Sequence, residues 1–72
     1  MTGEELTRQI QDGETINRVS LAGADLARAD LAGGVFEAVD FSGADLRGAR
    51  FRESILIGCR LDRAILDAAD LS

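Results

Sequence analysis

A large apolar residue stands at every fifth position of this chain from residue 16 to residue 71. These positions are Ile16, Leu21, Leu26, Leu31, Phe36, Phe41, Leu46, Phe51, Leu56, Leu61, Leu66 and Leu71. A period of five residues fits neither the 3.6-residue turn of an amphipathic helix nor the two-residue alternation of a strand with one exposed face. Repetition at a fixed period is therefore the feature that most constrains the fold.

A second set of positions lies two residues before the large apolar ones. Its members are all small or β-branched: Val19, Ala24, Ala29, Gly34, Val39, Ala44, Ala49, Ser54, Cys59, Ala64 and Ala69. A position that accepts nothing larger than valine indicates a narrow interior, because overpacking a dense core is costly. Both sets are therefore expected to point inward.

Three blocks carry the repeat in its most regular form, namely ADLAR at 24–28, ADLAG at 29–33 and ADLRG at 44–48. They resemble the A-(D/N)-L-x-x unit of the pentapeptide repeat family. This resemblance implies a right-handed quadrilateral parallel β-helix, in which each unit forms one side of a square and four units form one coil. Residues 16–71 would then make an all-β solenoid of just under three coils.

Residue identities twenty positions apart support four repeats in a coil, because such residues would stack on one side of the square about 4.8 Å apart. Opposite charges on neighbouring strands stabilise modestly. The expected columns are Asp40 with Arg60, Arg47 with Asp67, and Asp30 with Arg50 and Asp70. Asp25 beside Asp45 is the exception.

Residues 1–13 differ from the repeat and predict a short capping helix. Thr2 and Glu5 have the spacing of a capping box, and Gly13 is placed to end the helix in a left-handed conformation. A helix from about residue 3 to residue 12 would present Leu6 and Ile10 on one side. Solenoids need such a terminal cap. We expect a single domain, with the capping helix at 1–13 and the β-helix at 14–72.

The residue types needed for common catalytic and metal sites are missing. The chain has no histidine and one cysteine, Cys59, which excludes a Ser/His or Cys/His pair, a disulfide and a thiolate metal cage. Asp25 and Asp45 could share a proton as an acid/base pair, although a screened, solvent-facing position is the simpler interpretation. Cys59 falls in the inward set and is expected to be buried and inert. We therefore expect no enzyme, no cofactor and no metal.

The net charge is −5, from 13 acidic residues and 8 arginines. Direct binding to nucleic acid or to an anionic membrane needs a basic surface, which this composition argues against. The acidic N-terminus is not a secretory signal, and no apolar stretch approaches the length of a membrane span. The expectation is a cytoplasmic protein.

Two departures from the repeat suggest a protein interface. Apolar residues occupy outward positions on one face at Val35, Ile55 and Ile57, and at Ile65 two faces away. An exposed apolar patch often marks an interaction site, although β-branched residues are also simply good strand formers. In addition, nothing follows the last coil in this sequence, so an open apolar rim is expected at Leu56, Leu61, Leu66 and Leu71.

These observations predict a non-catalytic protein-protein interaction scaffold, which binds a partner or forms a homodimer through the uncapped C-terminal coil and the apolar side face. The resemblance supports the homodimer, since some family members dimerise through their C-terminal coils. The alternative, also implied by the resemblance, is an acidic DNA mimic that binds DNA gyrase or another type II topoisomerase. The small number of coils and the charges of Arg47, Arg50 and Arg60 oppose it. A module of a longer repeat array is a further possibility.

Overall fold

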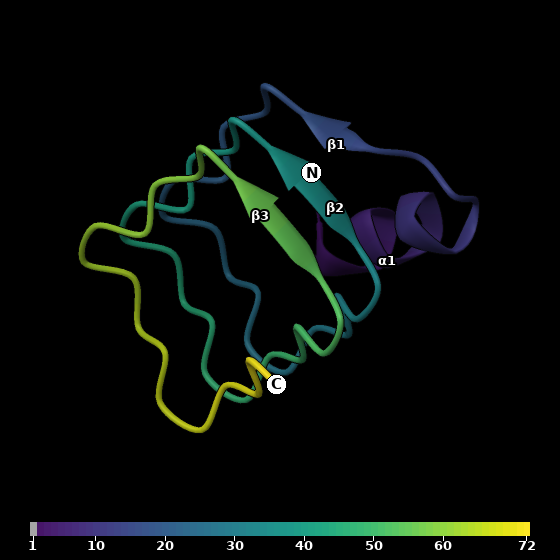
Figure 1. The fold of residues 1–72 in the computed structure, drawn as a ribbon. Helices are drawn as coiled ribbons and strands as arrows, with labels where there is room; N and C mark the ends of the chain where they lie inside the picture. The colour runs from purple at the N-terminus through teal and green to yellow at the C-terminus, as the bar shows by residue number, and fades with distance from the viewer. Residues whose placement is uncertain (1) are drawn as a thin grey trace.

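The computed structural model describes residues 2–72. Helix α1 (Gly3–Gln11) is followed by three short strands, β1 (Ile16–Asn17), β2 (Val35–Glu37) and β3 (Ile55–Ile57). The strands form a parallel sheet in the order β1-β2-β3, and the long connections between them stack in the same order (Figure 1). Met1, the first residue of the predicted capping segment, lies outside the described residues.

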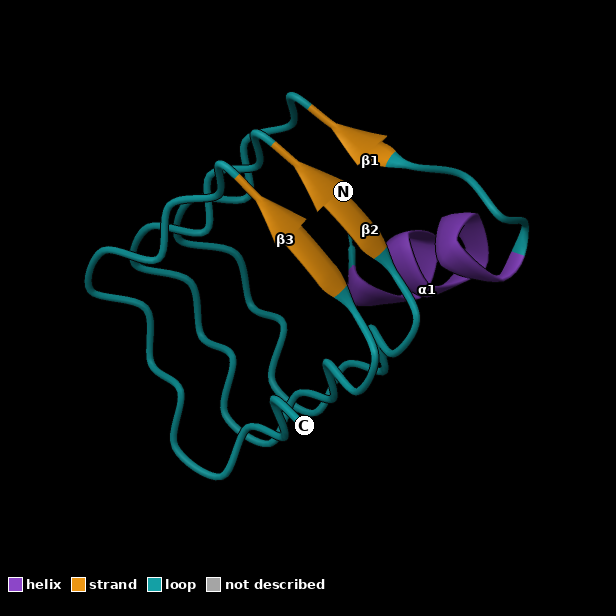
Figure 2. Cartoon of the chain, in the orientation of Figure 1, coloured by secondary structure: helices purple, strands orange, loops and turns teal. Residues whose placement is uncertain are grey.

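Backbone pairing repeats every twenty residues. In the sheet, Ile16 pairs with Phe36, and Phe36 pairs with Leu56. Single parallel bridges repeat this spacing in three further columns: Ser20–Asp40–Arg60, Asp25–Asp45–Ile65 and Asp30–Arg50–Asp70. The chain thus passes four pairing columns before it returns to the first, which confirms the predicted twenty-residue stacking. The architecture is a β-helix solenoid with a helix at its N-terminal end (Figure 2).

A left-handed residue recurs at every fifth position and turns the chain from one column to the next. Gly43, for example, has φ of +67° and Ala38 has φ of +56°. Glycine adopts this conformation without steric cost, whereas for a residue with a Cβ atom it costs about 1–2 kcal/mol. The fold therefore tolerates side chains at corners where glycine would be easier.

The predicted capping helix is present and begins with the predicted capping box. The Thr2 amide donates to Glu5 Oε1 at 3.0 Å, and the Glu5 amide donates to Thr2 Oγ1 at 3.2 Å. The helix ends at Gln11, one residue before the expected end, and Gly13 follows with φ of +78°. Leu6 is fully buried, so the helix covers the apolar interior of the first coil.

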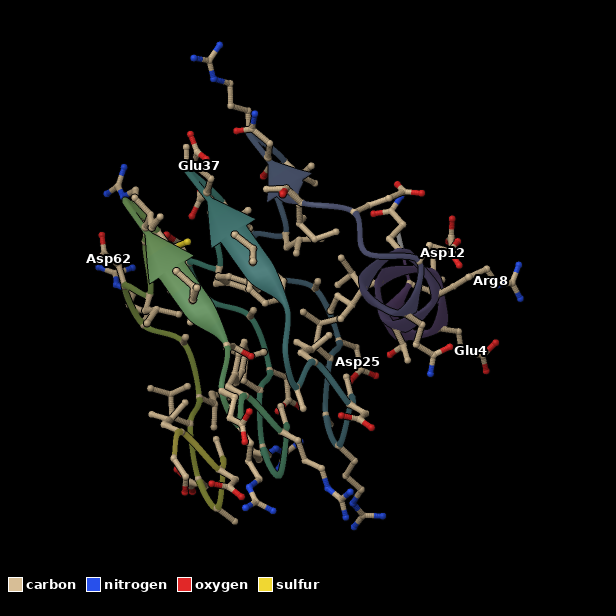
Figure 3. All side chains as sticks on the ribbon, turned by 45° about the vertical axis from the view of Figure 1, so that its right-hand side comes forward. Glu4, Arg8, Asp12, Asp25, Glu37 and Asp62 are labelled. Atoms are coloured by element: carbon tan, nitrogen blue, oxygen red, sulfur yellow. The ribbon has the colours of Figure 1, made fainter. Side chains whose placement is uncertain are left out.

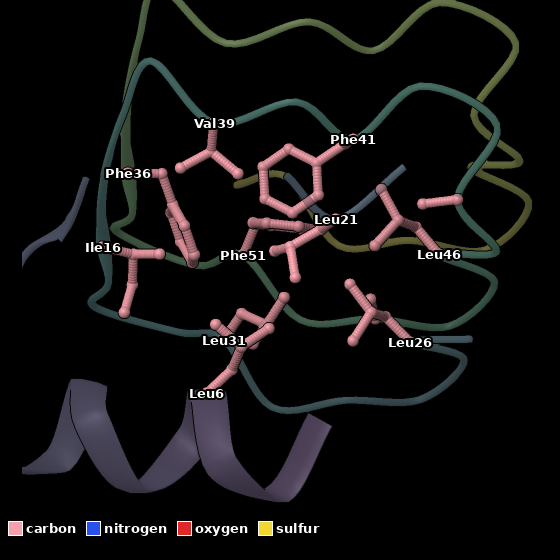
Figure 4. Close-up of a cluster of buried hydrophobic side chains, with 12 residues drawn as sticks. Leu6, Ile16, Leu21, Leu26, Leu31, Phe36, Val39, Phe41, Leu46 and Phe51 are labelled. Carbon is pink, nitrogen blue, oxygen red and sulfur yellow. The ribbon is translucent and has the colours of Figure 1, made fainter. Parts of the chain in front are cut away.

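The interior contains the large apolar residues of the first two coils. Its buried members include Leu6 from α1, Ile16, Leu21, Leu26 and Leu31 from the first coil, and Phe36, Phe41, Leu46 and Phe51 from the second (Figure 4). The three phenylalanines meet edge to face, with ring centroids 5.5–6.0 Å apart. The small residues Val39, Ala44 and Ala49 are buried beside them, as the repeat predicts.

Among residues 2–72, the close ion pairs join other partners than the charges stacked twenty residues apart. Acidic residues pair instead with arginines close to them in sequence or on an adjacent turn. The pairs are Arg47 with Asp45 at 2.7 Å, Arg60 with Asp62 at 2.8 Å, and Arg52 with Asp70 at 3.8 Å. A residue two positions along the chain spans the same turn, so its side chain reaches the carboxylate more directly than one on the next coil. The predicted charge columns are confirmed by the backbone pairing of Asp40 with Arg60 and of Arg50 with Asp30 and Asp70, although the close side-chain contacts are made with other partners.

Candidate protein interface

None of residues 2–72 covers the C-terminal end of the stack. Leu56, Leu61 and Leu71 are 36%, 37% and 60% exposed, whereas the residues in the same columns one coil earlier are at most 3% exposed. Figure 1 shows this coil at the end of the stack away from α1. Leu66, the fourth residue of the predicted rim, is partly buried against the core. Three of the four predicted rim residues are thus exposed.

The backbone of this coil also presents an unpaired edge. One coil earlier, the Phe41 amide donates to the Arg60 carbonyl at 2.8 Å, and the Val39 carbonyl accepts from the Arg60 amide at 3.0 Å. Within residues 2–72, the equivalent groups of the last coil form no backbone hydrogen bond; these are the amides of Leu61, Leu66 and Leu71 and the carbonyls of Cys59, Ala64 and Ala69. A β edge of this kind can pair with another chain.

The structure places the outward apolar residues in two columns, as the twenty-residue spacing predicts. Ile55 and Ile57 are exposed and flank Leu56 in β3, whereas Val35 beneath Ile55 is half-buried. Ile65 is also exposed, but it pairs with Asp45 in a different column. The apolar side face therefore consists mainly of Ile55 and Ile57, and Ile65 is not part of it.

Four residues of the last coil occupy equivalent outward positions, one in each pairing column. They are Ile55, Arg60, Ile65 and Asp70. Hydrogen bonds from Ser72, led by its hydroxyl at 2.6 Å, hold the pKa of Asp70 below its ordinary value. A hydrogen bond to Asp62 raises the pKa of Arg60. Arg60 and Asp70 therefore stay charged at neutral pH. Sequence reasoning did not single out this ring, although the twenty-residue columns contained the signal.

Asp25 and Asp45, which were considered as an acid/base pair, lie in one pairing column. Arg47 donates to both carboxylate oxygens of Asp45, at 2.9 and 2.7 Å, and these bonds lower the pKa of Asp45. Asp45 is therefore held as a carboxylate in an ion pair with Arg47, which agrees with the simpler interpretation of a solvent-facing charge. Cys59 is half-buried rather than buried, because none of residues 2–72 covers the coil to which it belongs, and its thiol lies 3.4 Å from the Phe36 carbonyl. Among residues 2–72, no group of three Cys, Asp or Glu side chains could hold a metal ion.

A groove of about 780 Å³ lies between α1 and the first coil, at the other end of the molecule. Its walls carry charges of both signs, including Glu4 and Arg8 from the helix and Asp25 from the coil (Figure 3). It contains no nucleophile paired with a base and no concentration of one charge. The open coil is therefore the stronger candidate site.

No helix within residues 2–72 is both long enough and apolar enough to cross a membrane.

Stacked parallel coils with a helical cap define a solenoid repeat protein. The family model for pentapeptide repeats matches residues 20–56 and 44–72, with eight copies of the repeat. The chain therefore belongs to the pentapeptide repeat family. Proteins of this family are generally non-catalytic scaffolds for protein interaction. No curated protein matches the chain.

Proposed function

We propose that this protein is a non-catalytic protein-protein interaction scaffold whose binding end is the uncapped C-terminal coil. The observation that carries the proposal is the exposure of Leu56, Leu61 and Leu71 in columns that are buried one coil earlier. In this proposal the solenoid is a right-handed quadrilateral stack of just under three coils. A coil placed over the open end would remove apolar surface from water, and each large side chain that becomes fully buried contributes about 1.5–3 kcal/mol.

A second copy of the chain is the proposed occupant of this end. Helix α1 opposes head-to-tail stacking, because it packs on the first coil through Leu6. In addition, its Thr7 hydroxyl donates a hydrogen bond to the Asp30 carbonyl, so this carbonyl is not free to pair with another chain. The uncovered ends can still meet each other, which produces a closed, symmetric homodimer. The apolar side face at Ile55 and Ile57 would lie at the border of this contact.

The test is the mass of the protein in solution, measured by sedimentation equilibrium. We expect a dimer for the wild type and a monomer for Leu61→Asp, because the variant places a charge at the centre of the contact. Ala22→Asp changes an exposed residue of the first coil and serves as the matched control, which should remain dimeric. A wild-type protein that is monomeric at every soluble concentration would contradict the homodimer.

The alternative function is that of an acidic DNA mimic that inhibits or protects DNA gyrase. The net charge of −5 supports it. A phosphate mimic, however, needs an unbroken acidic surface, whereas Arg50 stands between Asp30 and Asp70 in one column and Arg60 follows Asp40 in another. Inhibition of gyrase supercoiling, or protection of gyrase from a drug, at protein concentrations near those of the enzyme would favour the mimic over the scaffold.

A further inference from the structure

We infer that the two copies join with their last coils antiparallel, about a two-fold axis through the sides that carry Ile55 and Ile65. In this arrangement Ile55 faces Ile55 of the second copy, Ile65 faces Ile65, and each Arg60 faces Asp70 of the other chain. The inference rests on the proposed homodimer and adds its register. It explains why apolar residues stand at two outward positions on separate sides.

The backbone sets which residues can face each other. In each of three columns, the free carbonyl belongs to the residue before an outward position and the free amide to the residue after it, as at Cys59 and Leu61 around Arg60. In antiparallel pairing, the carbonyl accepts a hydrogen bond from an amide of the other chain, and the amide donates one to a carbonyl of that chain. The residue between this carbonyl and amide then lies opposite the corresponding residue of the other chain, as a non-hydrogen-bonded pair. The outward residues Arg60, Ile65 and Asp70 would therefore lie opposite outward residues of the other copy, and Ile55, which occupies the equivalent position in the fourth column, completes the set.

Symmetry leaves four ways to arrange the four sides. A two-fold axis perpendicular to the stack reverses strand direction, so all contacts are antiparallel, and the axis passes either through two opposite sides or through two opposite corners. An axis through the Arg60 and Asp70 sides would place arginine against arginine and aspartate against aspartate. Like charges directly opposite destabilise a pair of strands.

An axis through a pair of corners is also unfavourable. One such axis pairs Ile55 with Arg60 and Ile65 with Asp70, and the other exchanges the two charged partners. In both arrangements every charged side chain would face an apolar one. Only the axis through the Ile55 and Ile65 sides avoids both problems. It gives two apolar pairs and two Arg60–Asp70 pairs. Both charged side chains are largely solvent-accessible in the single chain, with exposed side-chain fractions of 68% for Arg60 and 43% for Asp70.

A charge exchange tests the Arg60–Asp70 contact. Arg60→Asp alone and Asp70→Arg alone each create two like-charge pairs, and we expect dimers about tenfold weaker or more for each variant. An equimolar mixture of the two variants restores both opposite-charge pairs and should form a heterodimer of nearly wild-type affinity. Asp62→Arg is the matched control, because it also removes the Arg60–Asp62 ion pair at 2.8 Å but should leave the dimer intact.

Single cysteines test the position of the axis. In a Cys59→Ala background, Ile55→Cys and Ile65→Cys should each form a disulfide between the two copies on mild oxidation. The Cα atoms of a non-hydrogen-bonded antiparallel pair lie about 4.5 Å apart, within the range that a disulfide spans. Arg60→Cys should remain uncrosslinked, because its partner is Asp70.

The outcomes separate the two proposals. A monomeric wild type would overturn the homodimer and with it the register. The register alone would be overturned, and the homodimer left standing, by a dimeric wild type combined with either of two results. One is that the Arg60→Cys variant crosslinks whereas the Ile55→Cys and Ile65→Cys variants do not. The other is that the charge-exchange mixture remains as weak as either variant alone.

Discussion

The Thr7 hydroxyl on α1 donates a hydrogen bond of 2.9 Å to the backbone carbonyl of Asp30. Asp30 belongs to the first coil, which has no earlier coil to pair with. The helix therefore does more than cover apolar side chains, since it also satisfies a polar group on the open β edge. Within the described part of the chain, no helix plays this role at the C-terminal coil.

Replacement of Thr7 by valine tests this contact. The substitution keeps the shape and removes the donor, so we expect the free energy of unfolding to fall by about 1 kcal/mol. Urea denaturation of the two proteins measures the difference. Thr15→Val, at an exposed position after the helix, is the matched control and should change stability little. Equal effects of the two substitutions would argue against a specific role for Thr7.

Gly34 leaves no room for a side chain between α1 and the second coil. A Cβ atom at this position would lie 2.9 Å from Ile10 Cδ1 and 2.7 Å from Phe36 Cε2. We expect Gly34→Ala to destabilise the fold by about 1–3 kcal/mol, because the helix and the phenylalanine ring would have to move. Thermal unfolding followed by circular dichroism is the measurement. An unchanged midpoint would mean that the helix shifts without cost.

The corners offer a test of backbone strain without a change in packing. Gly43 has φ of +67°, and a Cβ atom added there would have no neighbour within 4 Å. We expect Gly43→Ala to cost about 1–2 kcal/mol from conformation alone. The reverse change, Ala38→Gly, should stabilise the protein by a smaller amount, because glycine loses more backbone entropy on folding. Chemical denaturation of both variants should therefore give shifts of opposite sign.

The Asp45–Arg47 pair predicts a dependence of stability on pH. The hydrogen bonds from Arg47 lower the pKa of Asp45 in the folded state below its ordinary value, so folding favours the ionised carboxylate. This contribution is fully present above the unfolded-state pKa and disappears as the pH falls through the folded-state pKa. Asp45→Asn should therefore lower the urea midpoint at neutral pH and have a smaller effect in strong acid.

Arg47→Met provides the partner control for that measurement. Without the guanidinium the pKa of Asp45 should rise toward its ordinary value, and the variant should lose part of this pH-dependent stability, because the backbone amide of residue 47 still donates to Asp45 Oδ1. A pH profile identical to that of the wild type would contradict the coupling between the two side chains.

The interior and the stacking could be predicted from the sequence because inward positions restrict side-chain type. Only small residues fit at positions such as Ala44 and Ala49, and a large apolar residue must follow two positions later to fill the core. The capping helix was predictable for a similar reason, since Thr2, Glu5 and Gly13 each perform a specific backbone task.

The ion pairs could not be predicted in the same way. Arg47 has a flexible side chain with carboxylates both along its own turn and on the next coil, and the sequence spacing of twenty residues favours Asp67 as strongly as proximity favours Asp45. The structure places the short contact at Asp45. Leu66 is partly buried, whereas Leu56, Leu61 and Leu71 are exposed. The repeat pattern could not predict this difference, because all four residues occupy the same position in the repeat.

The twenty-residue pairing also limits how a chain of this kind can change in length. An insertion of twenty residues would lengthen the stack and leave Ile55 and Ile65 on their present sides. An insertion of five would turn the open end by a quarter of a coil relative to α1. Each five-residue insertion would therefore rotate a partner bound at the C-terminal end by a quarter of a coil relative to α1. The residues that contact the partner would stay the same.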